Sequence, residues 1–271
     1  MDEMEAVLSA PALLAQDAIA NRAIALATHG LSMSFGSLVV ARDIELNLPV
    51  GARYALIGPN GAGKTTLINL MTGMLTPNAG RIILGAEDIT DLEPQDRVRR
   101  GLARTFQINT LFPSLNALEA VTLAVGERRG IAGEFWSNLA GHKESIEEAY
   151  DILARLRLGD CCYQATRELP YGRQRLLEIA LALATKPKVL LLDEPAAGVP
   201  QEESGDIFEV VASLSDDLTL LFIEHDMHVV FRFATHIIVL VGGGIFTQGS
   251  PAEIAADPGV REVYLGKRKH G

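Results

Sequence analysis

The sequence predicts an α/β fold in which a parallel β-sheet has helices on both faces and is interrupted by a helical insert. Three observations support this prediction. A glycine-rich loop joins an apolar run to a helix-like segment within residues 53–71. Residues from about 112 to 186 are mostly helical in pattern, and strand-like and helix-like segments alternate again between 188 and 241. Such alternation is typical of a parallel sheet covered by helices.

Composition limits the class of protein. The 271 residues are 48% hydrophobic but only 6% aromatic, which predicts one folded unit with an aliphatic core. The formal net charge of −10 argues against nucleic acid as a partner, because binding to phosphates needs clustered Lys and Arg. No run approaches the roughly 18 apolar residues of a membrane-spanning helix. The acidic start also lacks the positive region of a secretory signal, so a cytoplasmic location is expected.

The predicted elements follow one another from an Ala-rich lead at residues 1–22. Short β-prone runs follow at 24–48, on either side of Phe35-Gly36. The insert has helix-like stretches near 116–125, 145–156 and 174–184. Beyond the insert, strands are predicted at 188–192, 219–223 and 236–241, and helices at 202–214 and 227–233. The adjacent Cys161 and Cys162 suit neither a structural disulfide nor a zinc site, and are interpreted as reduced packing residues.

The loop from Gly58 to Thr65 fits the phosphate-loop pattern G-x-x-x-x-G-K-[ST] at every required position. It follows an apolar run suited to a buried strand, 53–57, and precedes a helix-like segment, 64–71. In such a loop, backbone amides and the helix dipole face the phosphates. Lys64 neutralises the β- and γ-phosphates and the Thr65 hydroxyl binds Mg²⁺. The motif therefore predicts a protein that binds a nucleoside triphosphate.

Two acids, Asp193 and Glu194, end the aliphatic run 189–192. Carboxylates are costly to place at such a position without a task. Asp193 can hold Mg²⁺ through its water shell, and Glu194 can orient and deprotonate the attacking water.

Two further polar residues follow strand-like runs. Gln107 has an amide that can accept from the attacking water and bind Mg²⁺, and His225 can donate to the γ-phosphate as charge develops. Taken alone, either would be an ordinary amide or histidine. Their order and their strand-end positions favour a catalytic role.

These residues occur in the order found in the ATP-binding subunits of ABC transporters, which the chain resembles from Ile24 to Gly266. The signature segment of that family corresponds to residues 169–175. Finer features are similar to the importers of branched-chain and other hydrophobic amino acids, in particular to the larger of their two ATPase subunits. They are Arg104-Thr105-Phe106-Gln107, Leu111-Phe112-Pro113, Pro195-Ala196-Ala197-Gly198, Glu224-His225-Asp226-Met227 and Glu262-Val263-Tyr264-Leu265-Gly266.

The resemblance implies a P-loop NTPase (RecA-like) core with an N-terminal antiparallel β subdomain and a helical insert. It implies an extension at 1–22, a nucleotide-binding domain at 23–266 with its helical subdomain at about 112–186, and a tail at 267–271. The implied activity is ATP hydrolysis coupled to uptake of branched-chain amino acids or similar solutes. The implied partners are a second, different ATPase subunit, two membrane permease subunits and, indirectly, a solute-binding protein. These place the chain on the inner face of the membrane.

In this family each nucleotide lies between the phosphate loop of one subunit and the signature segment of the other. Gly172, expected just before a helix, would then present backbone amides to the γ-phosphate held by the partner. Phe35 corresponds to the aromatic residue that stacks on adenine, although from the sequence alone it is equally well a core residue. The implied nucleotide-binding set is Phe35, Gly58, Pro59, Asn60, Gly61, Ala62, Gly63, Lys64, Thr65, Thr66 and Gly172; the implied Mg²⁺ ligands are Thr65, Gln107 and Asp193.

Two prolines depart from the family pattern. Pro170 stands where a serine is usual and has neither a hydroxyl nor an amide hydrogen, so one γ-phosphate contact cannot form. Pro200 stands where an Asp or Asn usually contacts the other subunit. Both changes weaken the expectation that two copies of this chain alone form two efficient sites.

Three alternatives remain open at this point. A soluble ABC-type ATPase of DNA repair or translation would show paired ATPase domains, a zinc-bearing or coiled-coil insert, or a basic surface. A nucleotide-gated module that has lost hydrolysis would not need Lys64, Gln107, Glu194 and His225 together. An exporter commonly carries a fused membrane domain.

The apolar residues 111–113 are expected in an exposed loop, where they either anchor the insert or contact a permease.

Overall fold

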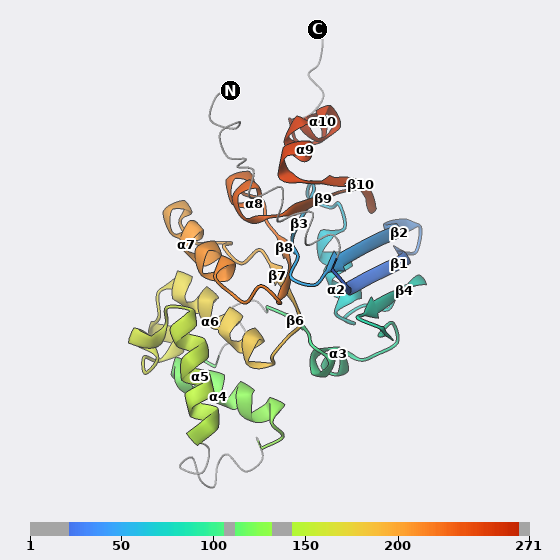
Figure 1. Ribbon diagram of the computed structural model, residues 1–271. Coiled ribbons are helices and arrows are strands. Elements are labelled where there is room, and N and C mark those ends of the chain that lie inside the picture. Colours follow the sequence, from blue (N-terminus) through green and yellow to red (C-terminus); the bar gives the residue numbers. More distant parts are fainter. Residues whose placement is uncertain (1–21, 106–111, 132–142, 266–271) are drawn as a thin grey trace. The chain divides into compact units, whose positions relative to one another are not determined.

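The computed structural model describes residues 22–105, 112–131 and 143–265, which divide into two compact units (Figure 1). Unit 1 comprises Met1–Arg97 and Asp216–Gly271, and unit 2 comprises Val98–Ser215. Helix α3, Pro94–Arg100, contains the first boundary between them. None of the helices in the described ranges has the length and apolar character that a membrane crossing demands.

Unit 1 contains two β-sheets. One is antiparallel, with the strand order β2-β1-β4-β5. In the other, β3 lies between two parallel neighbours, β8 and β9, and β10 pairs antiparallel with β9. The bounds are β1 Ile24–Phe35, β2 Leu38–Pro49, β3 Arg53–Ile57, α2 Lys64–Met71, β4 Ala79–Leu84, β5 Glu87–Asp88, β8 Thr219–Ile223, α8 Met227–Phe233, β9 His236–Val241, β10 Gly244–Gly249, α9 Pro251–Ala256 and α10 Pro258–Leu265.

The parallel strands of unit 1 confirm the bounds predicted from the sequence. Every residue of β8 is buried, and β3 ends in three buried residues. Strands buried on both faces have continuous apolar runs, which is why their ends are easily located. The β-prone runs predicted at 24–48, on either side of Phe35-Gly36, are confirmed as β1 and β2, but at 12 residues each these strands are longer than the short runs expected. In β2, the exposed Glu45 and Asn47 alternate with buried apolar residues and do not interrupt the strand.

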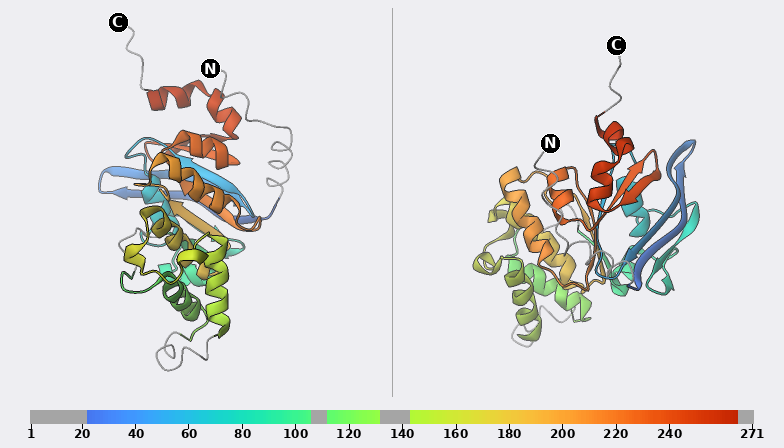
Figure 2. Two further views of the ribbon diagram at one scale, coloured as in Figure 1. Left: turned by 90° about the vertical axis from the view of Figure 1, so that its left-hand side faces the viewer. Right: turned by 45° about the horizontal axis from the view of Figure 1, so that its top comes forward.

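Unit 2 contains a pair of parallel strands and a group of helices. Its bounds are β6 Leu102–Arg104, α4 Ala117–Arg128, α5 Lys143–Arg155, α6 Tyr171–Ala184, β7 Val189–Asp193 and α7 Gln201–Ala212. Strand β6 pairs parallel with β7. Helices α4, α5 and α6 contact one another, as Figure 2 shows from two further directions. Helix α4 begins at a capping box in which Asn116 and Glu119 satisfy each other's backbone amides.

The start predicted for α6 is wrong by three residues. The helix begins at Tyr171, with Pro170 as its N-cap residue, so Gly172 lies inside the first turn and does not precede the helix. The amides of a first turn have no acceptor within the helix, and the Gly172 amide is one of them.

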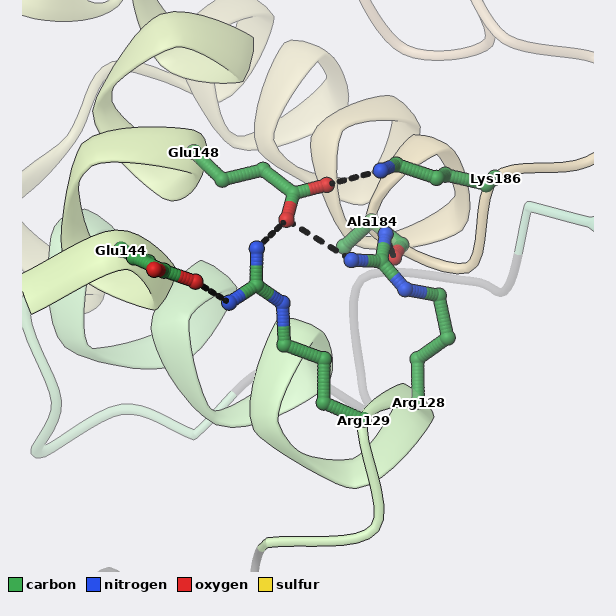
Figure 3. Close-up of polar contacts among 6 residues, drawn as sticks. All are labelled: Arg128, Arg129, Glu144, Glu148, Ala184 and Lys186. Carbon is green, nitrogen blue, oxygen red and sulfur yellow. Dashed lines mark hydrogen bonds and ion pairs between the residues drawn. The ribbon is translucent and has the colours of Figure 1, made fainter. Parts of the chain in front are cut away.

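A single carboxylate, that of Glu148, links helices α4 and α5 to the segment just after α6 (Figure 3). Glu148 Oε2, on α5, accepts hydrogen bonds from Arg128 and Arg129 of α4, both at 2.7 Å. Its Oε1 lies 3.0 Å from the Lys186 ammonium, just beyond α6. Arg128 also donates to the Ala184 carbonyl oxygen at 2.7 Å, in the last turn of α6. The hydrogen bond from Arg128 is the main cause that lowers the pKa of Glu148 to about 2.

We expect Glu148→Gln to lower the free energy of unfolding at neutral pH by about 1–3 kcal/mol, because three cations lose their shared anion. The pKa of Glu148 is depressed in the folded chain, so its contribution is present above the unfolded pKa of about 4.5 and is lost as pH falls towards about 2. Urea unfolding of both chains at several pH values measures this difference. A gap between them that stays constant from pH 7 to pH 2.5 would contradict the assignment.

Arg97 anchors the far end of α2, the helix that begins at Lys64. Its side chain is buried and donates to the carbonyl oxygens of Leu70 and Met71, both at 2.8 Å. It also donates to the backbone carbonyl oxygens of Leu92 at 2.9 Å and of Thr90 at 2.7 Å, which lie outside α2. The Leu70 and Met71 carbonyls belong to the last turn of α2, where a cation also opposes the negative end of the helix dipole. Arg97 therefore fixes α2 in place behind the loop.

Candidate active site

The phosphate-loop motif forms a tight turn between β3 and α2 in unit 1. Gly63 is the N-cap residue of α2, with φ of 102°. A Cβ atom at Gly63 would lie 2.4 Å from the Val40 carbonyl oxygen, and one at Gly58 would lie 2.2 Å from that of Leu240. Both positions therefore require glycine. The loop can place its amides close to an anion because it has no side chains at these two points.

Lys64 lies inside the turn of this loop. Its side chain is 7% exposed, and its ammonium donates to the Gly58 carbonyl oxygen at 2.7 Å and to that of Pro59 at 3.2 Å. A positive charge is thus held at the amino terminus of α2, where the helix dipole already favours an anion. Asn60, Gly61 and Thr65 are exposed on the same segment. The arrangement can bind a polyphosphate.

His225 lies at the same edge of the sheet as the phosphate loop. Strands β3 and β8 are parallel, with Leu56 opposite Ile223, and Gly58 and His225 each follow two residues later. His225 is exposed, and the next residue, Asp226, caps α8 by accepting from the His228 amide. The pairing of β3 with β8 therefore brings these two sequence-distant segments to one edge of the sheet within unit 1.

Phe35 lies on the surface at the end of β1, with 51% of its area exposed, so the interpretation of Phe35 as a core residue is wrong. It pairs with Leu38 across the β1–β2 turn, and β2 continues to Val40, whose carbonyl oxygen lies against Gly63. An exposed aromatic ring therefore lies at the end of β1, the strand paired with the one that touches the phosphate loop. Such a ring can stack on a flat base.

In unit 2, Asp193 is the last residue of β7 and is paired with Arg104, a residue to which the sequence assigned no role of its own. Arg104 of β6 donates to Asp193 Oδ2 at 2.5 Å. The side chains of Arg104 and Asp193 are 19% and 18% exposed, so the pair is largely shielded from water. The signal in the sequence is an arginine at the end of a short apolar strand, but its partner is fixed only by the pairing of β6 with β7.

Glu194 has an unusual backbone conformation, with φ of 49°. Non-glycine residues rarely adopt positive φ, and strained residues of this kind concentrate at functional positions. The next turn is closed by a hydrogen bond from the Ala197 amide to the Glu194 carbonyl oxygen at 3.0 Å. The turn therefore fixes where the Glu194 backbone lies. Gln107, the remaining predicted catalytic residue, lies outside the described residues.

The signature segment contacts the turn that follows Glu194. The Tyr171 ring packs on Gly198, where an added Cβ would lie 3.0 Å from the Tyr171 hydroxyl oxygen. Arg175, one turn further along α6, donates to the Ala197 carbonyl oxygen at 3.2 Å and to the Tyr171 hydroxyl at 3.2 Å. No side chain caps α6, because its N-cap residue is Pro170. The first-turn amides near Gly172 are therefore the helix's unsatisfied donors.

Comparison with known proteins gives a consistent result. A family model described as "ABC transporter" matches residues 41–197, and one described as "Branched-chain amino acid ATP-binding cassette transporter" matches residues 246–270. The chain is 36% identical over 251 residues to the high-affinity branched-chain amino acid transport ATP-binding protein BraF of Pseudomonas aeruginosa, covering 89% of this chain and 98% of BraF. The LivG protein of Escherichia coli K12 gives the same identity and coverage.

Solved structures agree with the sequence comparison. The ADP conformation of MJ1267, an ATP-binding cassette of an ABC transporter, superposes with a TM-score of 0.79 at 32% identity, covering 90% of this chain and 99% of that chain. A nucleotide-free ATP-binding cassette from an ABC transporter gives 0.79 at 31% identity, covering 90% and 100%.

Proposed function

The chain belongs to the ATP-binding family of ABC transporters, and from this premise we propose that it drives the uptake of branched-chain amino acids or closely similar solutes. It is an ATPase of the ABC importer type. One observation supports the solute class above all others, namely the match of residues 246–270 to the branched-chain family model. The described part of that region begins in β10 and forms α9 and α10. Helix α9 begins at a capping box of Ser250 and Glu253.

The proposed chemistry divides between described residues. Lys64 and the loop amides hold the β- and γ-phosphates, and Glu194 takes the proton of the attacking water. His225 donates a hydrogen bond as charge develops on the γ-phosphate oxygens. Each of these roles follows from the family's motif together with the positions given above.

Magnesium fits the oxygen donors that the motifs supply. The Thr65 hydroxyl is exposed in the phosphate loop, and the Asp193 carboxylate ends β7. Mg²⁺ prefers such hard oxygen ligands and keeps several waters, so it does not need a cage of protein side chains. Accordingly, no group of three or more His, Cys, Asp or Glu among the described residues is arranged to hold a metal. When bound, Mg²⁺ would neutralise developing charge on the phosphates.

The proposed partners are a second and different ATPase subunit, two permease subunits and a solute-binding protein that reaches the permeases, which would hold the chain at the inner face of the membrane. A mixed pair is favoured because Pro170, the N-cap residue of α6, offers neither a hydroxyl nor an amide to a γ-phosphate.

Phe112, 60% exposed, is the proposed permease contact. This exposure opposes the alternative that Phe112 anchors the insert.

Phosphate release tests the function. The chain alone should bind Mg-ATP and hydrolyse it slowly, and addition of the partner ATPase and the permeases should raise the rate.

Phe112→Asp should leave folding and ATP binding intact while weakening co-purification with the permeases and uncoupling uptake from hydrolysis. Tyr163→Asp, at another exposed aromatic residue (77% exposed), is a matched comparison. Fast hydrolysis by the dilute isolated chain would refute the shared site, and normal transport by Phe112→Asp would refute the contact.

Phe35→Ala should weaken binding of ATP and GTP alike, by about 1–3 kcal/mol, because stacking recognises the face of a base and not its edge. Calorimetric titration with both nucleotides measures the loss. Leu38→Ala, at a neighbouring residue that is 63% exposed, is the control and should bind normally. Equal affinities for wild type and Phe35→Ala would remove Phe35 from the nucleotide site.

A further inference from the structure

A small cavity in unit 2 lies beside the Arg104–Asp193 ion pair. Its volume is about 100 Å³, and it lies between α6, the β6 strand and the end of α3. Arg104 and Glu178 are the two charged residues of its lining, and the rest of the lining is aliphatic apart from Thr185. A cation and an anion thus line the same small cavity, although each is bonded to a different partner.

Glu178 has bonding capacity that the described residues leave unused. Its side chain is 4% exposed, and Oε2 accepts from Arg175 at 3.0 Å. Its other oxygen, Oε1, is buried and has no hydrogen-bond partner among the described residues. Burial outweighs Arg175 and raises the pKa of Glu178 to about 7. A buried carboxylate with one unsatisfied oxygen is costly, and a second cation at Oε1 would remove that cost.

Arg104 is bonded to the Asp193 carboxylate, which Mg²⁺ would also need. Its guanidinium contacts Asp193 at 2.5 Å, and both side chains are largely buried. A divalent cation brought close to Asp193 would repel the guanidinium, and that repulsion is weakly screened where water is excluded. Arg104 must then either oppose the metal or move.

We propose that Arg104 is a positioning residue that exchanges between two carboxylates: it pairs with Asp193 before the metal arrives and turns into the cavity to pair with Glu178 Oε1 when Mg²⁺ approaches Asp193. This inference rests on the proposed function, in which Asp193 takes part in Mg²⁺ binding. One carboxylate can serve two arginines at once, as Glu148 does in the same unit (Figure 3). In the absence of metal, Arg104 neutralises the charge of Asp193 and orients its carboxylate. When Arg104 leaves Asp193, Glu178 lowers the free-energy cost by accepting the guanidinium.

The test measures how strongly Mg²⁺ assists nucleotide binding. The dissociation constant of a non-hydrolysable ATP analogue is determined with EDTA and with Mg²⁺. The constant in EDTA divided by the constant in Mg²⁺ is then compared among variants, and a larger ratio means that Mg²⁺ assists binding more strongly. Arg104→Gln should raise this ratio by about tenfold, because a competing cation is removed. Glu178→Gln should lower it by about tenfold, because the displaced guanidinium loses its acceptor. The double variant should match Arg104→Gln alone, since Glu178 acts only through Arg104.

Glu148→Gln is the matched control, because it makes the same change at a carboxylate outside the cavity lining, and it should leave the ratio unchanged. An unchanged ratio in Glu178→Gln, or effects that simply add in the double variant, would overturn the exchange. If Arg104→Gln does not fold, Glu178→Gln decides alone. Asp193→Asn separates the proposed metal role of Asp193 from the proposed exchange of Arg104. An unchanged ratio there refutes the metal role of Asp193, whereas a lowered ratio with a normal Glu178→Gln refutes only the exchange.

Discussion

Glu194→Gln is expected to bind ATP with normal affinity and to hydrolyse it about 10²–10⁴-fold more slowly. The substitution keeps the size and most of the polarity of the side chain but removes the base that accepts a proton from water. The phosphate-binding residues lie elsewhere, in the loop that ends at Lys64, and are not altered. Binding and chemistry should therefore separate cleanly in this variant.

The measurement combines calorimetry for ATP affinity with single-turnover phosphate release in the assembled transporter. Glu127→Gln, an exposed glutamate of α4, is the control and should hydrolyse normally. The backbone of Glu194 has positive φ, so the folded state of the variant should be checked by thermal unfolding. Full turnover by a folded Glu194→Gln chain would show that another group deprotonates the water.

Lys64→Ala is expected to abolish tight ATP binding. The buried ammonium is a point charge at the amino terminus of α2, and its loss leaves phosphate oxygens without a charged donor. Truncating one partner of a buried charge pair costs about 2–5 kcal/mol, which corresponds to roughly 30- to 5,000-fold weaker binding. Equilibrium titration with a fluorescent ATP analogue measures the change.

The matched control is Lys188→Ala, at an exposed lysine just before β7. It removes the same charge from the chain and should bind ATP normally. Lys64 also donates to the Gly58 and Pro59 carbonyl oxygens, so the variant's thermal stability must be compared with that of the wild type. A folded Lys64→Ala chain with near-normal affinity would place the phosphates away from this loop.

The sequence predicts best those features that depend on local pattern. The bounds of β3, α2 and β8 follow from apolar runs and from a loop that only glycine can form. The strand-end position of Asp193 was likewise predictable, because a carboxylate stops an aliphatic run abruptly. Its partner Arg104 was not, since the pairing of β6 with β7 joins residues far apart in the chain. The exposure of Phe35, which excludes the core interpretation, also depends on what the rest of the chain covers.

Buried charges show the same limit. Arg97 and Glu178 look like ordinary surface residues in a charged stretch and an amphipathic helix. Their importance comes from burial and from specific acceptors: four backbone carbonyls for Arg97 and a single guanidinium for Glu178. Roles assigned to Lys64, Glu194, His225 and Gln107 stay predictions until the variants are measured.

The position of β3 between β8 and β9 constrains how the chain folds during synthesis. Strand β3 ends at Ile57, yet its two neighbours begin only at Thr219 and His236. At typical translation speeds of about 5–20 residues per second, the ribosome needs roughly 10–30 seconds to supply the first of them. Through that interval an apolar strand has neither edge hydrogen-bonded, whereas the strands and helices of unit 2 lie within one continuous segment of the chain. The nascent chain should therefore depend on chaperones until its last fifth emerges, and truncation before β9 should yield aggregates.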